Sequence, residues 1–180
     1  MVLAAAEPVL QAAEPAAAGT GLYAVAAAGS TRYGIDCWAS PFSCEGGHAG
    51  ATKLVLGWRS GEWGGELMAA DFGRASTAAS IASRPGETIR LRAAGLSLAG
   101  HGRMGDQWLV VGRVGVLRVR HERTGEAAMQ TWSPAVGLGA VWRATPMLGV
   151  ELAWDLTSGE GSDSGTGVAN AFTVGLRVGF

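Results

Sequence analysis

The chain has 180 residues, the size of one domain, so a protein of two full domains is not expected. Its 29 glycines, 7 tryptophans and 48% hydrophobic residues, against 16% charged ones, exclude an intrinsically disordered chain. The 14 lysines and arginines nearly balance 15 acidic residues, and this net charge of -1 argues against a nucleic-acid partner.

The first segment, residues 1–19, is a low-complexity run of Ala, Glu and Pro that predicts a flexible leader. Glu7 and Glu14 interrupt it and it contains no Lys or Arg, so a secretory signal has either been removed or never existed. The uncharged stretch Pro15–Thr31 is mostly Ala and Gly, which is unsuitable for a membrane-spanning helix. The predicted organisation is a leader over 1–19 and one folded domain over 20–180.

After the leader, apolar residues alternate with small or polar ones in eight segments, which is the period of a β-strand. Long polar connections and short turns follow one another in turn, so an antiparallel meander would collect all long connections at one end. This is the layout of a closed outer-membrane β-barrel, and the segments are long enough for the ~9–11 tilted residues that cross a bilayer. The predicted strands cover residues 20–30, 49–60, 62–73, 87–99, 106–121, 132–144, 147–157 and 168–180.

The first long connection contains the two cysteines of the chain, Cys37 and Cys44. Their short spacing in a segment rich in Gly, Ser and Pro predicts a local disulfide in an oxidising compartment. Two unlinked thiols are the alternative. A structural zinc site is not expected, because it needs four ligands.

The faces of the predicted strands can be assigned from their parity. Counting back from Phe180, large apolar residues occupy one face, while the other face carries Arg177, Gly175 and further small residues. Small residues on the inner face are typical of eight strands that close so tightly that side chains fill the lumen. The predicted fold class is therefore an all-β, eight-stranded antiparallel up-and-down transmembrane β-barrel with a filled lumen.

Charged residues with inner-face parity form the main candidate site. Buried charges are costly when unpaired, so we expect an internal salt-bridge network that plugs the lumen. The alternative is a gate whose ion pairs exchange partners and open a narrow pore. The residues of this predicted lumenal network are Lys53, Glu66, Arg113, Arg143, Glu151 and Arg177.

Aromatic residues give an independent indication of a membrane barrel, which needs them at the two headgroup levels. Trp58, Trp63, Trp108, Trp142 and Phe180 fall at the short-turn edge, and Phe72, Trp132, Trp154 and Phe172 fall near the other edge. The fourth segment is irregular, because its apolar residues change parity on the way to Leu96. A β-bulge near Ala94-Gly95 would restore its lipid-facing side.

The fifth segment ends in a basic cluster formed by Arg118, Arg120, His121 and Arg123. Arg118 has lipid-facing parity, and an arginine at mid-membrane costs ~2–4 kcal/mol, a cost that falls to near zero at the interface. We therefore expect Arg118 at headgroup height. There it either contacts lipopolysaccharide phosphates or simply extends its charge toward water.

Several motifs together resemble the transmembrane domain of the outer-membrane protein A family and its small eight-stranded relatives. They are Gly21-Leu22-Tyr23, the Lys53–Arg59 run, Glu66-Leu67 followed by Asp71-Phe72-Gly73, Gly112-Arg113-Val114-Gly115, and the terminal Gly175–Phe180 strand. The resemblance implies a bacterial outer membrane, periplasmic termini and extracellular long loops. It also implies that Phe180 is similar to the C-terminal signal read by the barrel-assembly machinery.

The sequence also departs from that family. Ala69 replaces the aromatic residue that usually follows Glu-Leu, and the peptidoglycan-binding domain of larger members is missing, so cell-wall tethering is not implied.

Enzyme motifs are weak. Gly100–Gly105 matches a dinucleotide fingerprint, but a strand follows it where a helix is needed, so we expect a glycine-rich turn. Gly161–Gly165 has Asp163 where a nucleophile elbow needs serine, and we expect a mobile loop there. Lipid A deacylases pair a histidine with a serine two positions later, a spacing that none of the three histidines has. We expect no enzymatic activity, no cofactor and no metal site.

The predicted function is that of a non-enzymatic integral outer-membrane barrel with a structural or interaction role, namely membrane stabilisation, loop display or membership of an envelope complex. Its expected partners are outer-membrane lipid and lipopolysaccharide, the barrel-assembly machinery during insertion, and a protein partner if it belongs to a complex. The alternatives are a narrow pore with a lumenal salt-bridge gate, a soluble lipocalin-like carrier and a lipid A-modifying enzyme.

Overall fold

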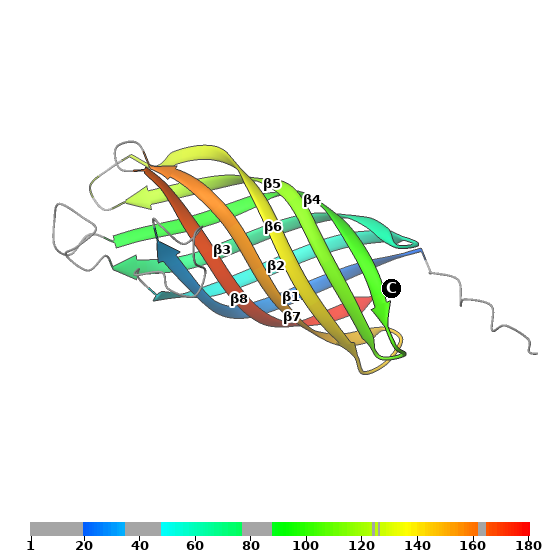
Figure 1. Ribbon diagram of the computed structural model, residues 1–180. Helices are drawn as coiled ribbons and strands as arrows, with labels where there is room; N and C mark the ends of the chain where they lie inside the picture. The colour runs from blue at the N-terminus through cyan, green and yellow to red at the C-terminus, as the bar shows by residue number, and fades with distance from the viewer. Residues whose placement is uncertain (1–19, 35–47, 77–87, 124, 126, 162–164) are drawn as a thin grey trace, which may run out of the picture.

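Eight antiparallel strands close into a barrel in chain order, as Figure 1 shows. The computed structural model describes residues 20–34, 48–76, 88–123, 125, 127–161 and 165–180. Each of the eight predicted strands is present, so the predicted fold class is confirmed. The strands are β1 (Gly21–Gly34), β2 (His48–Ser60), β3 (Trp63–Ser76), β4 (Thr88–Met104), β5 (Trp108–Arg123), β6 (Met129–Arg143), β7 (Leu148–Gly161) and β8 (Gly165–Gly179).

Closure removes the exposed edges that an open sheet would have. β1 pairs with β2 on one side and with β8 on the other. The pairing of β1 with β8 runs from Tyr23↔Gly179 to Gly34↔Val168 and closes the barrel. Every strand therefore has two hydrogen-bonded neighbours, which is the condition for strands to lie in a bilayer. The described residues include no helix long and apolar enough to cross a membrane.

The two ends of the barrel differ, as the alternating connections predicted. The turns that follow β2, β4 and β6, the start of β1 and the end of β8 lie at one end, called here the turn end, and the other four connections lie at the opposite end, the loop end (Figure 1). The connection between β7 and β8 is not the long loop that the sequence predicts, because it spans only residues 162–164. The strands reach further toward the loop end than predicted: β1 extends to Gly34 and β7 to Gly161. The prediction ended each strand where the alternation of apolar residues ends, but the backbone hydrogen bonds between neighbouring strands continue beyond that point.

The predicted glycine-rich turn at Gly100–Gly105 is wrong for most of its length. β4 continues through it, with His101 opposite Val111 and Met104 opposite Trp108. The turn begins only at Gly105, whose φ of 72° suits a residue without a side chain. Cross-strand pairing thus dominates over the weak strand preference of the glycines.

Large apolar side chains cover the outside of the barrel. Such a continuous apolar surface suits the hydrocarbon core of a bilayer rather than water. Aromatic residues border it, with Trp58, Trp63, Trp108, Trp142 and Phe180 exposed toward the turn end. The exposed aliphatic residues include Leu22, Leu54, Leu56, Leu67, Leu96, Leu98, Val114, Val116, Leu138, Leu152, Val174 and Leu176.

Two of the aromatics predicted at the loop-end edge are placed differently. Phe72 is buried inside the barrel, because it shares the inward parity of Glu66 and Met68. Trp154 does face outward, but it lies in the middle of β7, and its indole Nε1 donates a hydrogen bond to Asn170 Oδ1 at 2.5 Å. Trp132 and Phe172 are exposed.

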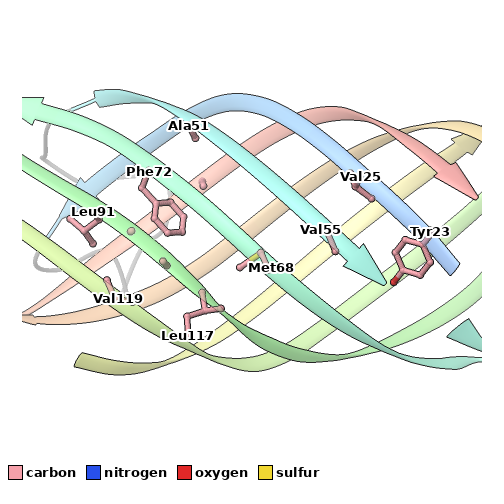
Figure 2. Packing of buried hydrophobic residues seen from close by; sticks show 12 residues of the cluster. Tyr23, Val25, Ala51, Val55, Met68, Phe72, Leu91, Leu117 and Val119 are labelled. Carbon is pink, nitrogen blue, oxygen red and sulfur yellow. The ribbon is translucent and has the colours of Figure 1, made fainter. Parts of the chain in front are cut away.

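The inside of the barrel is packed with side chains, as predicted for so narrow a sheet. Figure 2 shows Phe72, Leu91 and Leu117 pointing inward, with Tyr23 further along the barrel. The buried cluster draws on both ends of the chain, since Val25 of β1 and Ala171 of β8 belong to it with Val119 of β5. Charged residues of the candidate site lie between these apolar residues.

The bulge that the sequence predicts near Ala94-Gly95 in β4 is wrong in its position. The register shift lies in β3, where Phe72 and Gly73 together stand opposite the single residue Leu91. Gly73 has a φ of 80°, and a Cβ there would overlap the backbone of Gly50. β4 itself needs no bulge, because Leu91 and Ala93 belong to the buried cluster and its inward and outward residues alternate without interruption.

Candidate functional site

The centre of the lumen is a chain of buried ion pairs. Arg113 of β5 donates from Nε to Glu66 Oε2 of β3 and from Nη2 to Glu151 Oε1 of β7, both at 2.7 Å. Glu151 accepts a further bond from Arg177 Nη1 of β8 at 3.1 Å. All four side chains are buried, and two cations face two anions. Each charge is therefore compensated where water is largely excluded.

Tyr23 and His101 complete this centre, and the sequence reasoning missed both. The Tyr23 hydroxyl donates to Glu66 Oε1 at 2.6 Å, and the Arg177 guanidinium lies 3.7 Å from the centre of the tyrosine ring. His101 meets the same ring edge-on. The signal that could have found Tyr23 is its inward parity in β1. In the structure it lies opposite Gly57, where a Cβ would overlap the tyrosine ring.

A second ion pair lies beside the first group. Lys53 Nζ of β2 bonds Asp155 Oδ2 of β7, and both side chains are buried. Asp155 was not among the predicted network residues, although its inward parity was visible in the alternation of β7. Two cavities next to this pair measure about 10 Å³ each, roughly the space of one water molecule.

Arg143 lies apart from the other five predicted network residues. Its Nη2 donates to the backbone carbonyl of Asp106 in a turn, and its Nε is buried without a hydrogen-bond partner among the described residues. The structure thus brings together Glu66, Arg113, Glu151 and Arg177, and gives Lys53 a different partner. Phe180 is exposed at the end of the chain, while Cys37, Cys44 and the leader lie outside the described residues.

A second charged group lies on the outside of β3, β4 and β5, toward the loop end. We call it the arginine belt. It combines five arginines with two carboxylates, and it lies directly beyond the apolar band, since Arg118 is opposite Ala94 on one side and Trp132 on the other. Its members are Asp71, Arg74, Arg90, Arg92, Arg118, Arg120 and Glu122.

The two carboxylates of the belt are shared among three arginines. Asp71 pairs with Arg90 and, at 3.3 Å, with Arg92, while Glu122 is 3.0 Å from Arg120 Nε. Like charges stand opposite one another at Arg92↔Arg120, a pairing that these acids offset. In the described part of the chain, Arg74 and Arg118 have no ion-pair partner, so the belt carries an excess of positive charge.

The β3 bulge determines the composition of the belt. Because Phe72 and Gly73 occupy one position of the ladder, Asp71 and Arg74 both reach the outer surface, although they are three residues apart. The backbone N–H of Gly73 also donates to Asp71 Oδ1 at 2.9 Å. Burial tends to raise the pKa of Asp71, but the hydrogen bonds from Arg90 and Gly73 hold it below its ordinary value.

The rest of the basic cluster predicted at the end of β5 divides between the two faces. Arg118 and Arg120 are exposed on the outer face, whereas His121 has inward parity and burial lowers its pKa. His121 therefore adds no charge to the belt near neutral pH. The side chain of Arg123 lies outside the described residues.

The described residues contain no group of three or more His, Cys, Asp and Glu side chains placed to hold a metal ion. The strongest acid–base candidate, His101, faces Tyr23 and Arg177. The arrangement can hold a barrel together and attract anions.

The fold itself has close counterparts among solved structures. The neisserial surface protein A structure superimposes with a TM-score of 0.66 at 14% identity, covering 88% of this chain and 97% of that one. The chain has the fold of the small eight-stranded outer-membrane β-barrels. A complex of Yersinia pestis Ail, the attachment invasion locus protein, with the heparin analogue sucrose octasulfate matches at 0.59 and 12% identity, covering 89% and 99%. OprG of Pseudomonas aeruginosa matches this barrel at 0.56 and 14%, covering 91% and 98%.

The sequence alone does not place the chain among named families. No protein-family model matches it, and no curated protein matches it either. The likeness therefore concerns the barrel architecture.

Proposed function

We propose that the protein is a non-enzymatic integral outer-membrane barrel that stabilises the membrane by binding lipopolysaccharide along its outer face. The observation that carries the proposal is the arginine belt, which combines five arginines with two acids directly beyond the lipid-facing surface. Lipid phosphates lie at this depth of a membrane, and arginine pairs with phosphate through two parallel hydrogen bonds.

The proposed orientation places the turn end and both termini in the periplasm and the loop end outside the cell. The belt then lies in the outer leaflet, where lipopolysaccharide is found. Phe180, exposed at the end of the last strand, is proposed to act as the assembly signal during insertion. The same orientation displays the long loops to the surroundings.

The exposed arginines of the belt are suited to a phosphate ligand. The side chains of Arg92 and Arg120 are about half exposed, at 48% and 50%. Arg74 and Arg118 are exposed as well, without a carboxylate partner in the described residues. The complex of Ail with sucrose octasulfate supports the proposal by analogy, because a barrel of this fold there holds a polyanion.

Binding of purified lipopolysaccharide and of sucrose octasulfate to the detergent-solubilised protein tests this proposal. A belt variant, R92Q/R118Q/R120Q, should bind both at least about tenfold more weakly, since each lost charge-assisted hydrogen bond contributes roughly that factor. R103Q, which removes an exposed arginine at the turn end, is the matched control and should bind as the wild type does. Equal binding by the belt variant and the control would overturn the proposal.

The alternatives have less structural support. A pore would need the buried pairs of Arg113 and Lys53 to separate, and the neighbouring cavities are no larger than a water molecule. A soluble carrier would expose the apolar outside of the barrel to water. A lipid A-modifying enzyme would need a nucleophile beside a histidine, whereas His101 faces Tyr23 and Arg177.

A further inference from the structure

Tyr33 is a half-buried residue near the loop end of β1. Its ring packs against the buried apolar cluster, and its hydroxyl reaches β3. The hydroxyl donates a hydrogen bond to the backbone carbonyl oxygen of Phe72 at 2.6 Å and lies 3.1 Å from that of Gly73. β2 lies between β1 and β3 in the sheet, so Tyr33 connects two strands that are not neighbours.

The sequence of β2 leaves room for this contact. At the loop end of β2 the residues are Ala49, Gly50 and Ala51, and none of them has a side chain larger than a methyl group. A larger side chain on the inner face of β2 would lie between Tyr33 and β3. The strands are also close together here, since a Cβ at Gly73 would come within 2.1 Å of the Gly50 carbonyl oxygen.

The two carbonyl groups that Tyr33 contacts belong to the bulge of β3. Neither Phe72 nor Gly73 is paired with a described residue of β2 or β4. A buried backbone carbonyl without a hydrogen bond is costly, and the Tyr33 hydroxyl supplies this bond from the lumen. On the outer side, the Gly73 N–H bonds Asp71 Oδ1 at 2.9 Å. The bulge is thus held from both faces of the sheet.

The bulge decides on which face of the sheet Arg74 lies. By strict alternation from the outward-facing Asp71, Phe72 and Arg74 would both face the lumen. The bulge reverses the parity after Gly73, so Arg74 is exposed on the outside, opposite Arg90. Arg74 is one of the two belt arginines without an ion-pair partner in the described part of the chain. Its place on the outer face therefore adds uncompensated positive charge to the belt.

We propose that Tyr33 is a positioning residue of the arginine belt. From inside the lumen, its hydroxyl holds the bulge that keeps Arg74 on the outer face, where Arg74 takes part in binding a phosphate-bearing ligand. The inference rests on the function proposed for the belt. It makes binding on the outside of the barrel depend on a hydrogen bond on the inside, and by linkage a ligand on Arg74 stabilises the bulge in return.

Tyr33→Phe tests the local part of the inference, because it removes the hydroxyl and keeps the ring. Amide hydrogen exchange of Gly73, followed by NMR of the full chain in nanodiscs, should become at least about tenfold faster. Thr31→Val is the matched control, since Thr31 is buried on the same face of β1 and its hydroxyl has no hydrogen-bond partner among the described residues. Exchange that is unchanged in Tyr33→Phe overturns the inference.

Binding of sucrose octasulfate in a nonionic detergent tests the consequence for the belt. Tyr33→Phe should bind at least about threefold more weakly than the wild type, and Thr31→Val should bind as the wild type does. In an Arg74→Gln background, Tyr33→Phe should cause no further loss, because its effect acts through Arg74. A general loss of folding would weaken binding equally in both backgrounds, and that result overturns the inference.

The belt variant R92Q/R118Q/R120Q separates this inference from the proposed function. If that variant binds weakly while Tyr33→Phe binds as the wild type does, the inference fails and the proposed function stands. If that variant binds as the wild type does, the proposed function fails. Faster Gly73 exchange in Tyr33→Phe then still supports the role of Tyr33 in placing Arg74, and unchanged exchange overturns it.

Discussion

Glu66 and Arg113 form an ion pair of 2.7 Å at the centre of the barrel, and both side chains are almost completely buried. Glu66 comes from β3 and Arg113 from β5, so their pairing connects strands that are not neighbours in the sheet. The Glu66 carboxylate also accepts a hydrogen bond from Tyr23, and the Arg113 guanidinium also donates one to Glu151. Through Glu151 of β7, the pair is connected to the wall of the lumen opposite β3, and its loss should affect the whole barrel.

Glu66→Gln should lower the free energy of unfolding by about 3–5 kcal/mol, because it leaves the single carboxylate of Glu151 to compensate two buried cations, Arg113 and Arg177. Urea unfolding of the protein reconstituted in lipid vesicles measures this value. Glu62→Gln, in an exposed turn four residues away, is the control and should change stability by less than about 0.5 kcal/mol. Equal stabilities of the two variants would show that the pair does not stabilise the barrel.

The wild-type barrel should not conduct ions. The lumenal charges are paired, and the cavities beside Lys53 and Asp155 measure about 10 Å³. Planar-bilayer recordings of the purified protein should therefore lack discrete current steps at moderate voltage. Reproducible steps would favour the gated-pore alternative over the plug.

Gly57→Ala should disturb the tyrosine at the centre of the barrel. A Cβ at Gly57 would overlap the Tyr23 ring and displace its hydroxyl from Glu66, so we expect a destabilisation of about 1–3 kcal/mol. Gly112→Ala is the control, because a Cβ there has open space around it. Thermal unfolding in detergent compares the two, and a larger effect at Gly112 would contradict the packing described.

The depth of Arg118 can be tested against that of Val116, two residues earlier on the same face of β5. Val116→Arg should cost about 2–4 kcal/mol if Val116 lies in the hydrocarbon region, whereas Arg118→Leu should change stability little. Unfolding in vesicles measures both. A small effect of Val116→Arg would place the edge of the membrane elsewhere.

The pH dependence of Asp71 has a defined sign. Its pKa lies below the ordinary value of 3.8, so its ion pairs with Arg90 and Arg92 are fully present above that value. Their contribution is lost as the pH falls through the lowered pKa. The stability difference between the wild type and Asp71→Asn should therefore be constant from neutral pH down to about pH 5 and narrow only below about pH 4. A difference that already narrows near neutral pH would show that the carboxylate is not held in its charged form.

Parity explains why most of the fold could be predicted from the sequence. A closed barrel imposes the same alternation on every strand, so inner and outer residues such as Arg177 and Leu176 can be assigned by counting. Phe72 was misplaced because its aromatic type was given more weight than its parity with Glu66. The sequence predicts a bulge in β4 because the apolar residues Leu91 and Ala93 are assigned to the lipid face, whereas both are buried in the lumen.

Pairings across the lumen could not be predicted in the same way. Alternation places a charge inside the barrel but does not give its height, which depends on the stagger of the strands. Lys53 therefore meets Asp155, and Arg143 bonds the carbonyl of Asp106 at the turn end instead of joining Arg113. The arginine belt was only partly visible, since Arg90 and Arg92 come from one strand, Arg118 and Arg120 from the next, and Arg74 depends on the bulge.

Extraction of the native protein tests the central claim, a barrel that spans the outer membrane, most directly. Cells that make the full chain are fractionated, and the outer membranes are washed with alkaline carbonate before mild detergent is added. We predict that the protein stays with the membranes through the wash and leaves in detergent as a barrel of 18.3 kDa that retains lipopolysaccharide in native mass spectra. Release of the folded protein into carbonate without detergent would contradict the account.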